Sequence, residues 1–253
     1  MVARKSNYTA TARNFKMAGA RCYSECSMLV IGHRGARGLA PENTLASFKE
    51  ALAAGVHEIE LDVRVTKDGI CVLNHDPYLH DASGGKLRHI LVHQHTLAEL
   101  YKQRPDLTTL EEAIRLIKHR VPIVIEVKPR VPTAEVIAVV RHFLADGWKP
   151  ADFLFASFRQ HILRDLHAAV PSIETVVLAR VSGVRARWRA RQLDTKRLAF
   201  NHHNLWWGFI AAMHKKGYKI TTYSLNDPVK AARWKRYGLY GTITDFPDRF
   251  KKK

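Results

Sequence analysis

Long apolar runs are absent from this sequence of 253 residues, and cysteine is scarce. No apolar stretch approaches the roughly 20 residues that a membrane-spanning helix needs. The amino-terminal segment lacks the apolar core and small-residue cleavage site of a secretory signal. Three cysteines, an odd number, argue against a disulfide framework and fit a reducing compartment. We therefore expect a cytoplasmic protein; the Arg, Ser and Thr content of the amino terminus leaves an organelle-transit segment as the alternative.

Acidic residues are also scarce, because 23 Asp and Glu stand against 41 Lys and Arg, which gives a formal net charge of +18. This excess raises the rate of encounter with any polyanion. No RNA-recognition, zinc-finger or KH-type pattern is present, so we expect no specific binding of nucleic acid. Residues 180–197, RVSGVRARWRARQLDTKR, carry six arginines, Trp188 and a single acid. We interpret this stretch as a solvated helix face, with weak association with an anionic membrane as the alternative.

Short apolar, β-rich runs alternate with helical stretches along the chain. The predicted strands are 28–32, 57–63, 70–74, 122–127, 152–156, 174–179, 197–200, 218–224 and 240–244. The predicted helices are 43–54, 109–119, 133–146, 159–169, 205–216 and 227–237. Repeated strand–helix units predict a parallel sheet, and about eight of them predict a closed (β/α)₈ TIM barrel.

Two features predict that this α/β barrel is somewhat irregular. There are nine strand candidates, one more than a closed barrel needs, and the link between 63 and 70 is too short for a helix. We therefore expect a short insertion after the third strand. Residues 28–250 are expected to form the barrel domain, and residues 1–27 a flexible, basic amino-terminal extension.

Carboxylates recur on the apolar strands, where burial of even a single unpaired carboxylate costs free energy. In HEIELDVRV, Glu60 and Asp62 are two residues apart, so both project from the same face of one strand. Two adjacent buried acids repel each other unless a cation lies between them. In PIVIEVKP, Glu126 and Lys128 share a strand face in the same way.

Two further strands end in histidine. LVIGHRG ends with His33 and Arg34, and ICVLNHDP ends with His75. The carboxyl ends of parallel barrel strands converge on one mouth, where active sites lie. Three carboxylates suit one Mg²⁺ or Ca²⁺ ion. Two imidazoles suit a general base and a general acid, and the two cations, Arg34 and Lys128, suit a phosphate.

The stretch GHRGARGLAPENTLASFKEALAAGVHEIELDVRVTKDGICVLNHDP resembles the glycerophosphodiester phosphodiesterase family almost position for position. The resemblance continues through LTTLEEAI, IVIEVKP, FASF, HKKGYKITTYSLND and YGTITDFP, and so extends over 28 to 250. It implies a TIM-barrel hydrolase. The implied site residues are His33 and His75 as the catalytic pair, Glu60, Asp62 and Glu126 as metal ligands, and Arg34 and Lys128 as phosphate contacts.

The resemblance implies that His33 is the base and His75 the acid. The nucleophile is either water or the glycerol 2-hydroxyl. Two departures from the family pattern flank the site: YLHDASGGK follows His75-Asp76-Pro77, and Tyr223 stands where tryptophan is usual. They leave the alcohol specificity open. The histidine-rich run from His80 to His95 is interpreted as a surface loop, because it has no matching acids.

The expected function is metal-dependent hydrolysis of a small glycerophosphodiester to glycerol 3-phosphate and an alcohol. The first alternative is a phospholipase that acts on lysophospholipid or phosphatidylinositol at a membrane surface. A non-catalytic, polyanion-binding barrel is the second. The intact set of acids and histidines argues against this second alternative, because binding an anion requires neither paired acids nor two imidazoles.

Overall fold

Eight parallel strands form a closed barrel in the computed structural model, which describes residues 28–80 and 85–251. The strands are β1 (Leu29–Gly32), β2 (Glu58–Val65), β6 (Ile123–Val127), β7 (Phe153–Ser157), β8 (Glu174–Ala179), β9 (Arg197–Asn201), β10 (Lys219–Tyr223) and β11 (Gly241–Thr244). The barrel closes because β1 pairs with both β11 and β2. The predicted TIM barrel is confirmed; the expected extension over residues 1–27 lies outside the described residues.

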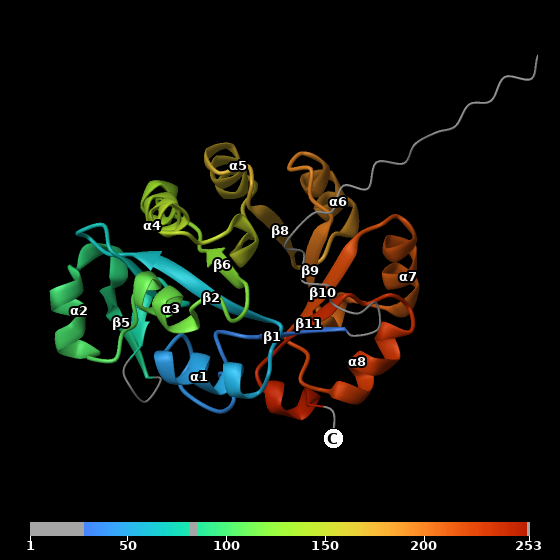
Figure 1. The fold of residues 1–253 in the computed structure, drawn as a ribbon, viewed down its shortest axis with the longest axis horizontal. Helices are drawn as coiled ribbons and strands as arrows, with labels where there is room; N and C mark the ends of the chain where they lie inside the picture. The colour runs from blue at the N-terminus through green and yellow to red at the C-terminus, as the bar shows by residue number, and fades with distance from the viewer. Residues whose placement is uncertain (1–27, 81–84, 252–253) are drawn as a thin grey trace, which may run out of the picture.

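Helices surround the strands on the outside of the barrel (Figure 1). They are α1 (Leu45–Ala53), α3 (Leu110–Ile117), α4 (Thr133–Ala145), α5 (Gln160–Ala169), α6 (Gly183–Arg191), α7 (Trp207–Lys215) and α8 (Pro228–Lys235). Side-chain caps fix several helix starts: Thr44 and Ser47 form a capping box at α1, and Asp227 accepts backbone hydrogen bonds at α8. Within the described residues, no helix is long and apolar enough to cross a bilayer.

The third predicted strand is not a barrel strand. Residues Cys71–Leu73 form β3, which pairs antiparallel with the end of β2. Only five residues separate the two strands, too few for the crossover that a parallel pair needs, so the chain turns back at Gly69, whose φ is +81°. The strand prediction holds, but the crossover from β2 to the next barrel strand, β6, passes instead through α3.

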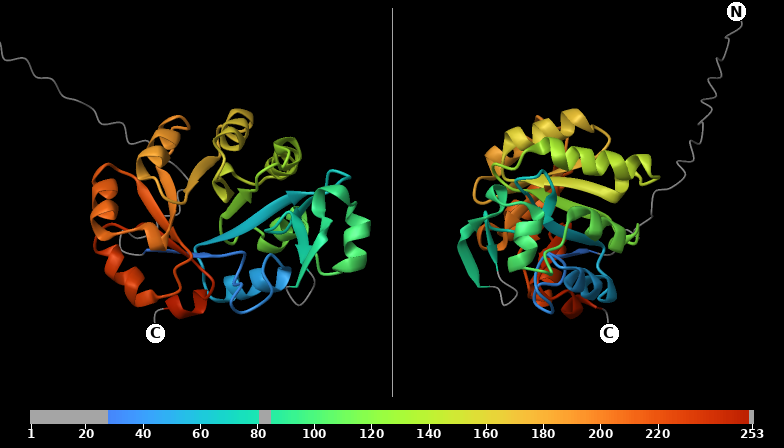
Figure 2. Two further views of the ribbon diagram at one scale, coloured as in Figure 1. Left: turned by 180° about the vertical axis from the view of Figure 1, so that it is seen from behind. Right: turned by 90° about the vertical axis from the view of Figure 1, so that its left-hand side faces the viewer.

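The expected insertion is a small lobe on one side of the barrel (Figure 2). It contains the antiparallel pair β4 (Tyr78–His80) and β5 (Lys86–Leu91), the 3₁₀ turn η1 (Val92–Gln94) and α2 (Leu97–Gln103). Its own apolar cluster consists of Val72, Leu79, Ile90, Val92, Leu100 and Leu107. The lobe therefore has a packed interior, and β3 and its Val72 connect it to the barrel.

The basic stretch 180–197 is not one solvated face. Arg189 on α6 is buried, and it donates hydrogen bonds to Leu178 O (2.9 Å), Ser157 O (3.2 Å) and Gln160 Oε1 (3.0 Å). Arg197 is also buried, within the barrel. Its guanidinium donates to both oxygens of Glu58 on β2, at 2.9 and 2.7 Å. The interpretation was wrong for these two arginines, because residue type alone does not separate them from exposed neighbours.

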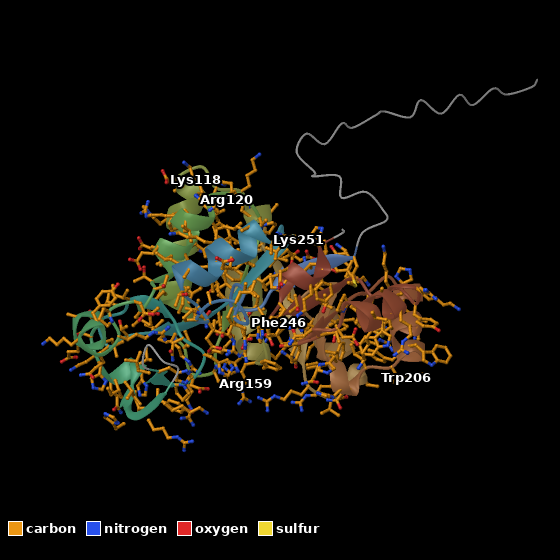
Figure 3. All side chains as sticks on the ribbon, turned by 90° about the horizontal axis from the view of Figure 1, so that it is seen from below. Lys118, Arg120, Arg159, Trp206, Phe246 and Lys251 are labelled. Atoms are coloured by element: carbon orange, nitrogen blue, oxygen red, sulfur yellow. The ribbon has the colours of Figure 1, made fainter. Side chains whose placement is uncertain are left out.

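The two ends of the barrel carry different side chains (Figure 3). Arg159 and Trp206, which follow β7 and β9, lie toward one end, and Lys118 and Arg120, which precede β6, lie toward the other. The first end is therefore the mouth formed by the carboxyl ends of the strands, where active sites of this fold lie.

Candidate active site

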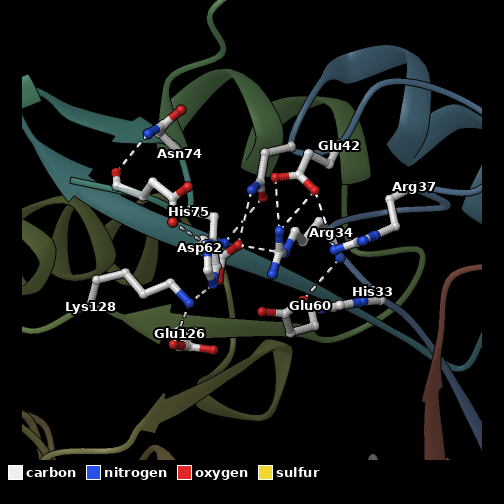
Figure 4. Close-up of polar contacts among 12 residues, drawn as sticks. His33, Arg34, Arg37, Glu42, Glu60, Asp62, Asn74, His75, Glu126 and Lys128 are labelled. Carbon is white, nitrogen blue, oxygen red and sulfur yellow. Dashed lines mark hydrogen bonds and ion pairs between the residues drawn. The ribbon is translucent and has the colours of Figure 1, made fainter. Parts of the chain in front are cut away.

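Three carboxylates meet at the mouth of the barrel. Glu60 and Asp62 come from β2 and Glu126 from the adjacent β6, where Asp62 and Glu126 are direct partners in the strand register. All three side chains are buried, and one oxygen of each lies within 4.8 Å of the others. Figure 4 shows them facing a common point. The two-residue spacing on β2 and the pairing of adjacent strands therefore bring the predicted metal ligands together.

Burial makes this concentration of negative charge costly. Burial and the charges of Asp62 and Glu126 raise the pKa of Glu60 well above its usual value. Burial also raises the pKa of Glu126. Burial would act the same way on Asp62, but Lys128 and Arg34 outweigh it and hold the Asp62 pKa well below its usual value. A cation at this point would favour the ionised form of all three acids.

Lys128 lies among the acids that it was predicted to accompany. Its Nζ is 2.6 Å from Asp62 Oδ1 and 2.5 Å from Glu126 Oε1. These two carboxylates raise the Lys128 pKa although burial opposes the charged form. The ammonium is therefore fixed in its charged state beside the carboxylate group.

Arg34 is held by both its backbone and its side chain. Its φ of 51° is left-handed, and its backbone N–H donates to Glu60 Oε2 at 2.9 Å. The guanidinium Nε lies 2.9 Å from Asp62 Oδ2, and Nη1 donates to both Glu42 oxygens at 2.8 Å. Asn43 exchanges hydrogen bonds of 3.1 Å with the Asp62 side chain and backbone N–H. The loop after β1 thus orients an acid of β2.

The imidazole of His33 is oriented by the far end of the chain. Its Nδ1 lies 2.5 Å from Asp245 Oδ1, just after β11, and 3.0 Å from Ser224 Oγ, just after β10. Asn226 holds the other Asp245 oxygen at 2.9 Å. Burial lowers the pKa of His33, and the hydrogen bond to Asp245 opposes that shift. With Nδ1 engaged in this way, Nε2 is the nitrogen left for chemistry.

His75 is supported by a carboxylate in the same manner. Its Nδ1 is 2.9 Å from Asp76 Oδ1, while Asp76 Oδ2 is 2.9 Å from His80 Nε2. Arg64 donates to His75 O at 2.8 Å and to Pro129 O at 3.2 Å, which fixes the loop after β3 to the end of β6. Burial and the charge of Lys128 lower the pKa of His75 to about 4.

One cavity of about 650 Å³ is lined by both histidines, both cations and the acids Glu60 and Glu126, with Asp62 buried behind them. His33, His75, Glu60 and the adjacent cations form its polar wall. Its remaining wall comes from the strands β7 to β10 and includes Phe158, Leu178 and Tyr223. The cavity is therefore polar beside the acids and mixed elsewhere, where Arg197 and Asn201 stand among the apolar side chains.

The residues of this cavity fit a hard divalent cation. Carboxylate oxygens from three side chains are the donors that Mg²⁺ and Ca²⁺ prefer, and these acids come from two paired strands that hold them in place. In the described part of the chain, they form the single group of three acidic, histidine or cysteine side chains close enough to share an ion.

The sequence model of the glycerophosphoryl diester phosphodiesterase family matches residues 33–249 of this chain. The chain belongs to this family. The family resemblance inferred from the motifs is therefore confirmed, and as a member the chain is a phosphodiesterase. The glycerophosphodiester phosphodiesterase of Bacillus altitudinis is 28% identical over 246 residues, which cover 88% of this chain and 96% of that protein.

Solved structures of glycerophosphodiester phosphodiesterases and related enzymes share the architecture. A phosphodiesterase of Oleispira antarctica, in complex with the product sn-glycerol-3-phosphate, is 28% identical with a TM-score of 0.75 over 88% of this chain and 94% of that one. The glycerophosphodiester phosphodiesterase of Thermotoga maritima is 27% identical with a TM-score of 0.71, over 88% and 97% of the two chains.

All seven predicted site residues of this phosphodiesterase lie together, but several of their partners were not predicted. Asp245, Ser224 and Asn226 support His33, and His80 supports His75 through Asp76. A signal was present for Asp245, because TITD also ends a strand with an acid. His80 lies on β4 rather than in the predicted surface loop, and nothing local in the sequence indicates its contact with Asp76.

Proposed function

We propose that this phosphodiesterase hydrolyses glycerophosphodiesters to glycerol 3-phosphate and an alcohol, with one divalent cation and two histidines. The observation that carries the proposal is the shared cavity, in which two members of the three-carboxylate cluster, Glu60 and Glu126, lie beside two imidazoles. Each imidazole is in turn held by its own carboxylate. The product named in the Oleispira antarctica complex, sn-glycerol-3-phosphate, supports the choice of substrate class.

Glu60, Asp62 and Glu126 would hold one Mg²⁺ or Ca²⁺ ion. When bound, the ion supplies a Lewis acid that polarises a non-bridging phosphate oxygen. With the three acids ionised, Arg34 and Lys128 leave the group one formal negative charge. A divalent ion reverses this to one positive charge, which matches a singly charged phosphodiester. The two side-chain cations then serve as contacts for the phosphate.

His33 and His75 divide the proton transfers in this proposal. His33 Nε2 removes a proton from the nucleophile, which is water or the glycerol 2-hydroxyl, while Asp245 stabilises the imidazolium that forms. His75 donates a proton to the alkoxide that leaves phosphorus. With water as nucleophile, one P–O bond forms and one breaks, and the alcohol leaves neutral.

The low pKa of His75 sets a condition on its role as acid. Burial and Lys128 lower this pKa to about 4, so the free imidazole is neutral at neutral pH. A phosphodiester anion in the cavity favours the imidazolium and raises the pKa. We therefore infer that His75 acquires its proton together with the substrate rather than before it.

The alcohol is the least constrained part of the substrate. The wall formed by β7 to β10 combines apolar side chains such as Phe158 and Leu178 with polar ones such as Asn201 and Asn204, so it accommodates more than one kind of alcohol. A lysophospholipid or phosphatidylinositol is the second candidate substrate, and the arginine- and tryptophan-containing stretch 180–197, which reaches the cavity at Arg180, favours it.

Product analysis by ³¹P NMR tests the proposal. With sn-glycero-3-phosphocholine and Mg²⁺ or Ca²⁺, we expect the signal of glycerol 3-phosphate to replace that of the diester, no turnover after chelation, and recovery when the ion is restored. A transient cyclic phosphate would assign the 2-hydroxyl as nucleophile. No turnover of any glycerophosphodiester with either ion would overturn the proposal.

A further inference from the structure

Exposed apolar side chains gather on two neighbouring segments at the mouth of the barrel. Val181, Val184 and Trp188 lie on the segment after β8, and Trp206 and Trp207 lie at the start of α7. Each of the five is between 58 and 79% exposed. Large apolar side chains exposed in groups, rather than singly, mark binding surfaces.

Direct contacts join the two segments to each other. Asn204 Nδ2 donates to Arg180 O at 2.7 Å. Phe209 on α7 packs against Gly183 at the start of α6, so closely that a Cβ at Gly183 would lie 2.3 Å from the ring. The five apolar residues therefore belong to one surface, which we call the basic–aromatic rim (residues 180–188 and 204–207).

The basic–aromatic rim is continuous with the active-site cavity. Arg180, Val181 and Asn204 line the same cavity as His33 and Glu126. Figure 3 shows Trp206 toward the end of the molecule that also carries Arg159, the end where the cavity opens. A molecule or surface bound at the rim therefore lies beside the entrance to the catalytic groups.

Positive charge accompanies the apolar side chains on this rim. Arg180 and Arg185 are exposed, and Arg187 is half-buried. The sequence from 175 to 226 contains a single acid, Asp194. Buried Arg189 is occupied by its three hydrogen bonds and does not belong to this charge.

We propose that the basic–aromatic rim docks on an anionic phospholipid surface. Tryptophan and valine insert among headgroups and acyl chains, and arginines attract anionic lipid, the combination that interfacial proteins use. Docking brings the cavity entrance to the lipid surface, so a diester in that surface becomes a substrate. That last consequence rests on the proposed function, whereas the docking itself does not.

Co-sedimentation with vesicles tests the docking. The protein should bind vesicles of phosphatidylcholine with phosphatidylserine at low salt, bind pure phosphatidylcholine vesicles weakly, and dissociate as salt is raised. Trp206→Ser/Trp207→Ser and Arg185→Glu/Arg187→Glu should each weaken binding, the arginine variant about 100-fold or more, since each neutralised charge alone is worth roughly fivefold.

A matched charge reversal at the opposite end of α7 is the control. Lys215→Glu/Lys216→Glu changes charge by the same amount on exposed residues distant from the mouth, and it should retain most vesicle binding. Turnover of soluble glycerophosphocholine should be unchanged in all three variants, which reports that each remains folded.

Three results would overturn docking: no co-sedimentation at low salt, equal loss of binding in the lysine control, or equal binding to pure phosphatidylcholine. Tighter binding to duplex DNA than to the anionic vesicles would also overturn it. Vesicle binding without turnover of any diester would instead refute the proposed function and leave docking intact.

Discussion

Asp245 contributes to the site through His33. Its carboxylate engages His33 Nδ1, and together with its charge this contact raises the His33 pKa against the lowering caused by burial. The carboxylate also selects the tautomer that leaves Nε2 as the base, a role that is worth orders of magnitude in turnover where it has been removed from other imidazole bases.

Replacement of Asp245 by Asn should therefore change both rate and pH dependence. We expect turnover to fall by about 10²-fold or more. The His33 pKa, already below its usual value, should fall further. Because a base works when deprotonated, the acidic limb of the kcat profile, measured with substrate bound and His75 protonated, should move to lower pH in this variant.

Ser224→Ala is the control for this residue pair, because it removes the other Nδ1 contact without removing a charge. It should leave the acidic limb nearly in place. An Asp245→Asn variant with an unshifted limb and wild-type turnover would refute the positioning role of Asp245.

At the residue scale, the sequence predicts a site residue when the residues next to it in the chain belong to the same site. Glu60 and Asp62 are two apart on one strand, and His33 and Arg34 are adjacent, so local spacing is informative. Asp245 lies 212 residues from His33, and only closure of the barrel brings them together. Arg189 and Arg191 look alike in the sequence, although one is buried and one exposed.

At the scale of elements, a buried ion pair connects two barrel strands. Arg197 on β9 and Glu58 on β2 pair inside the barrel, and Glu58 raises the Arg197 pKa although burial opposes the charge. Arg197 also lies over the ring of Tyr240 at 5.4 Å. The guanidinium therefore stays charged in any accessible pH range.

Glu58→Gln should leave this buried charge with only the more distant Glu174, at 3.9 Å, as a partner. We expect the free energy of unfolding, measured by urea denaturation, to fall by about 3–5 kcal/mol. Replacing both residues by Met removes the charge as well and should be much less destabilising than the single change.

The control is Glu111→Gln, which breaks an exposed pair with Arg115 on α3 and should cost at most about 1 kcal/mol. If Glu58→Gln costs no more than this exposed change, the barrel interior solvates Arg197 in some other way and the ion pair is not a stabilising link.

Strand identity could be predicted at this scale, but strand direction only in part. Residues 70–74 are as apolar as the barrel strands, and nothing in their composition distinguishes an antiparallel strand. The informative feature was the short link before them, which excludes a crossover helix. Helix ends agreed to within a few residues because their caps are local, as at Thr44 and Asp227.

At the scale of the whole molecule, the barrel closes within residues 29–244. Leu29 pairs with Gly241, so the first and last strands complete each other. A chain that begins at Met28 therefore contains every barrel strand of the described residues and should fold and turn over glycerophosphocholine like the full chain. Thermal unfolding and turnover measured side by side test this, and a large loss of either in the shorter chain would contradict it.

The central claim for the molecule is that ion binding and proton transfer belong to different side chains in one cavity. The carboxylates Glu60, Asp62 and Glu126 would hold the ion, while His33 and His75 move protons. Replacing a carboxylate should therefore alter the ion concentration that turnover requires, and replacing a histidine should alter the maximal rate.

Turnover of glycerophosphocholine as a function of free Mg²⁺ or Ca²⁺ tests this claim most directly, in the wild type, Glu126→Gln and His75→Ala. Glu126→Gln should need a higher ion concentration, with Glu111→Gln behaving as wild type. His75→Ala should keep the wild-type half-saturating ion concentration but lose about 10²–10⁴-fold in maximal turnover. Full turnover by the chelated wild type, or by His75→Ala, would show that the chemistry lies in other residues.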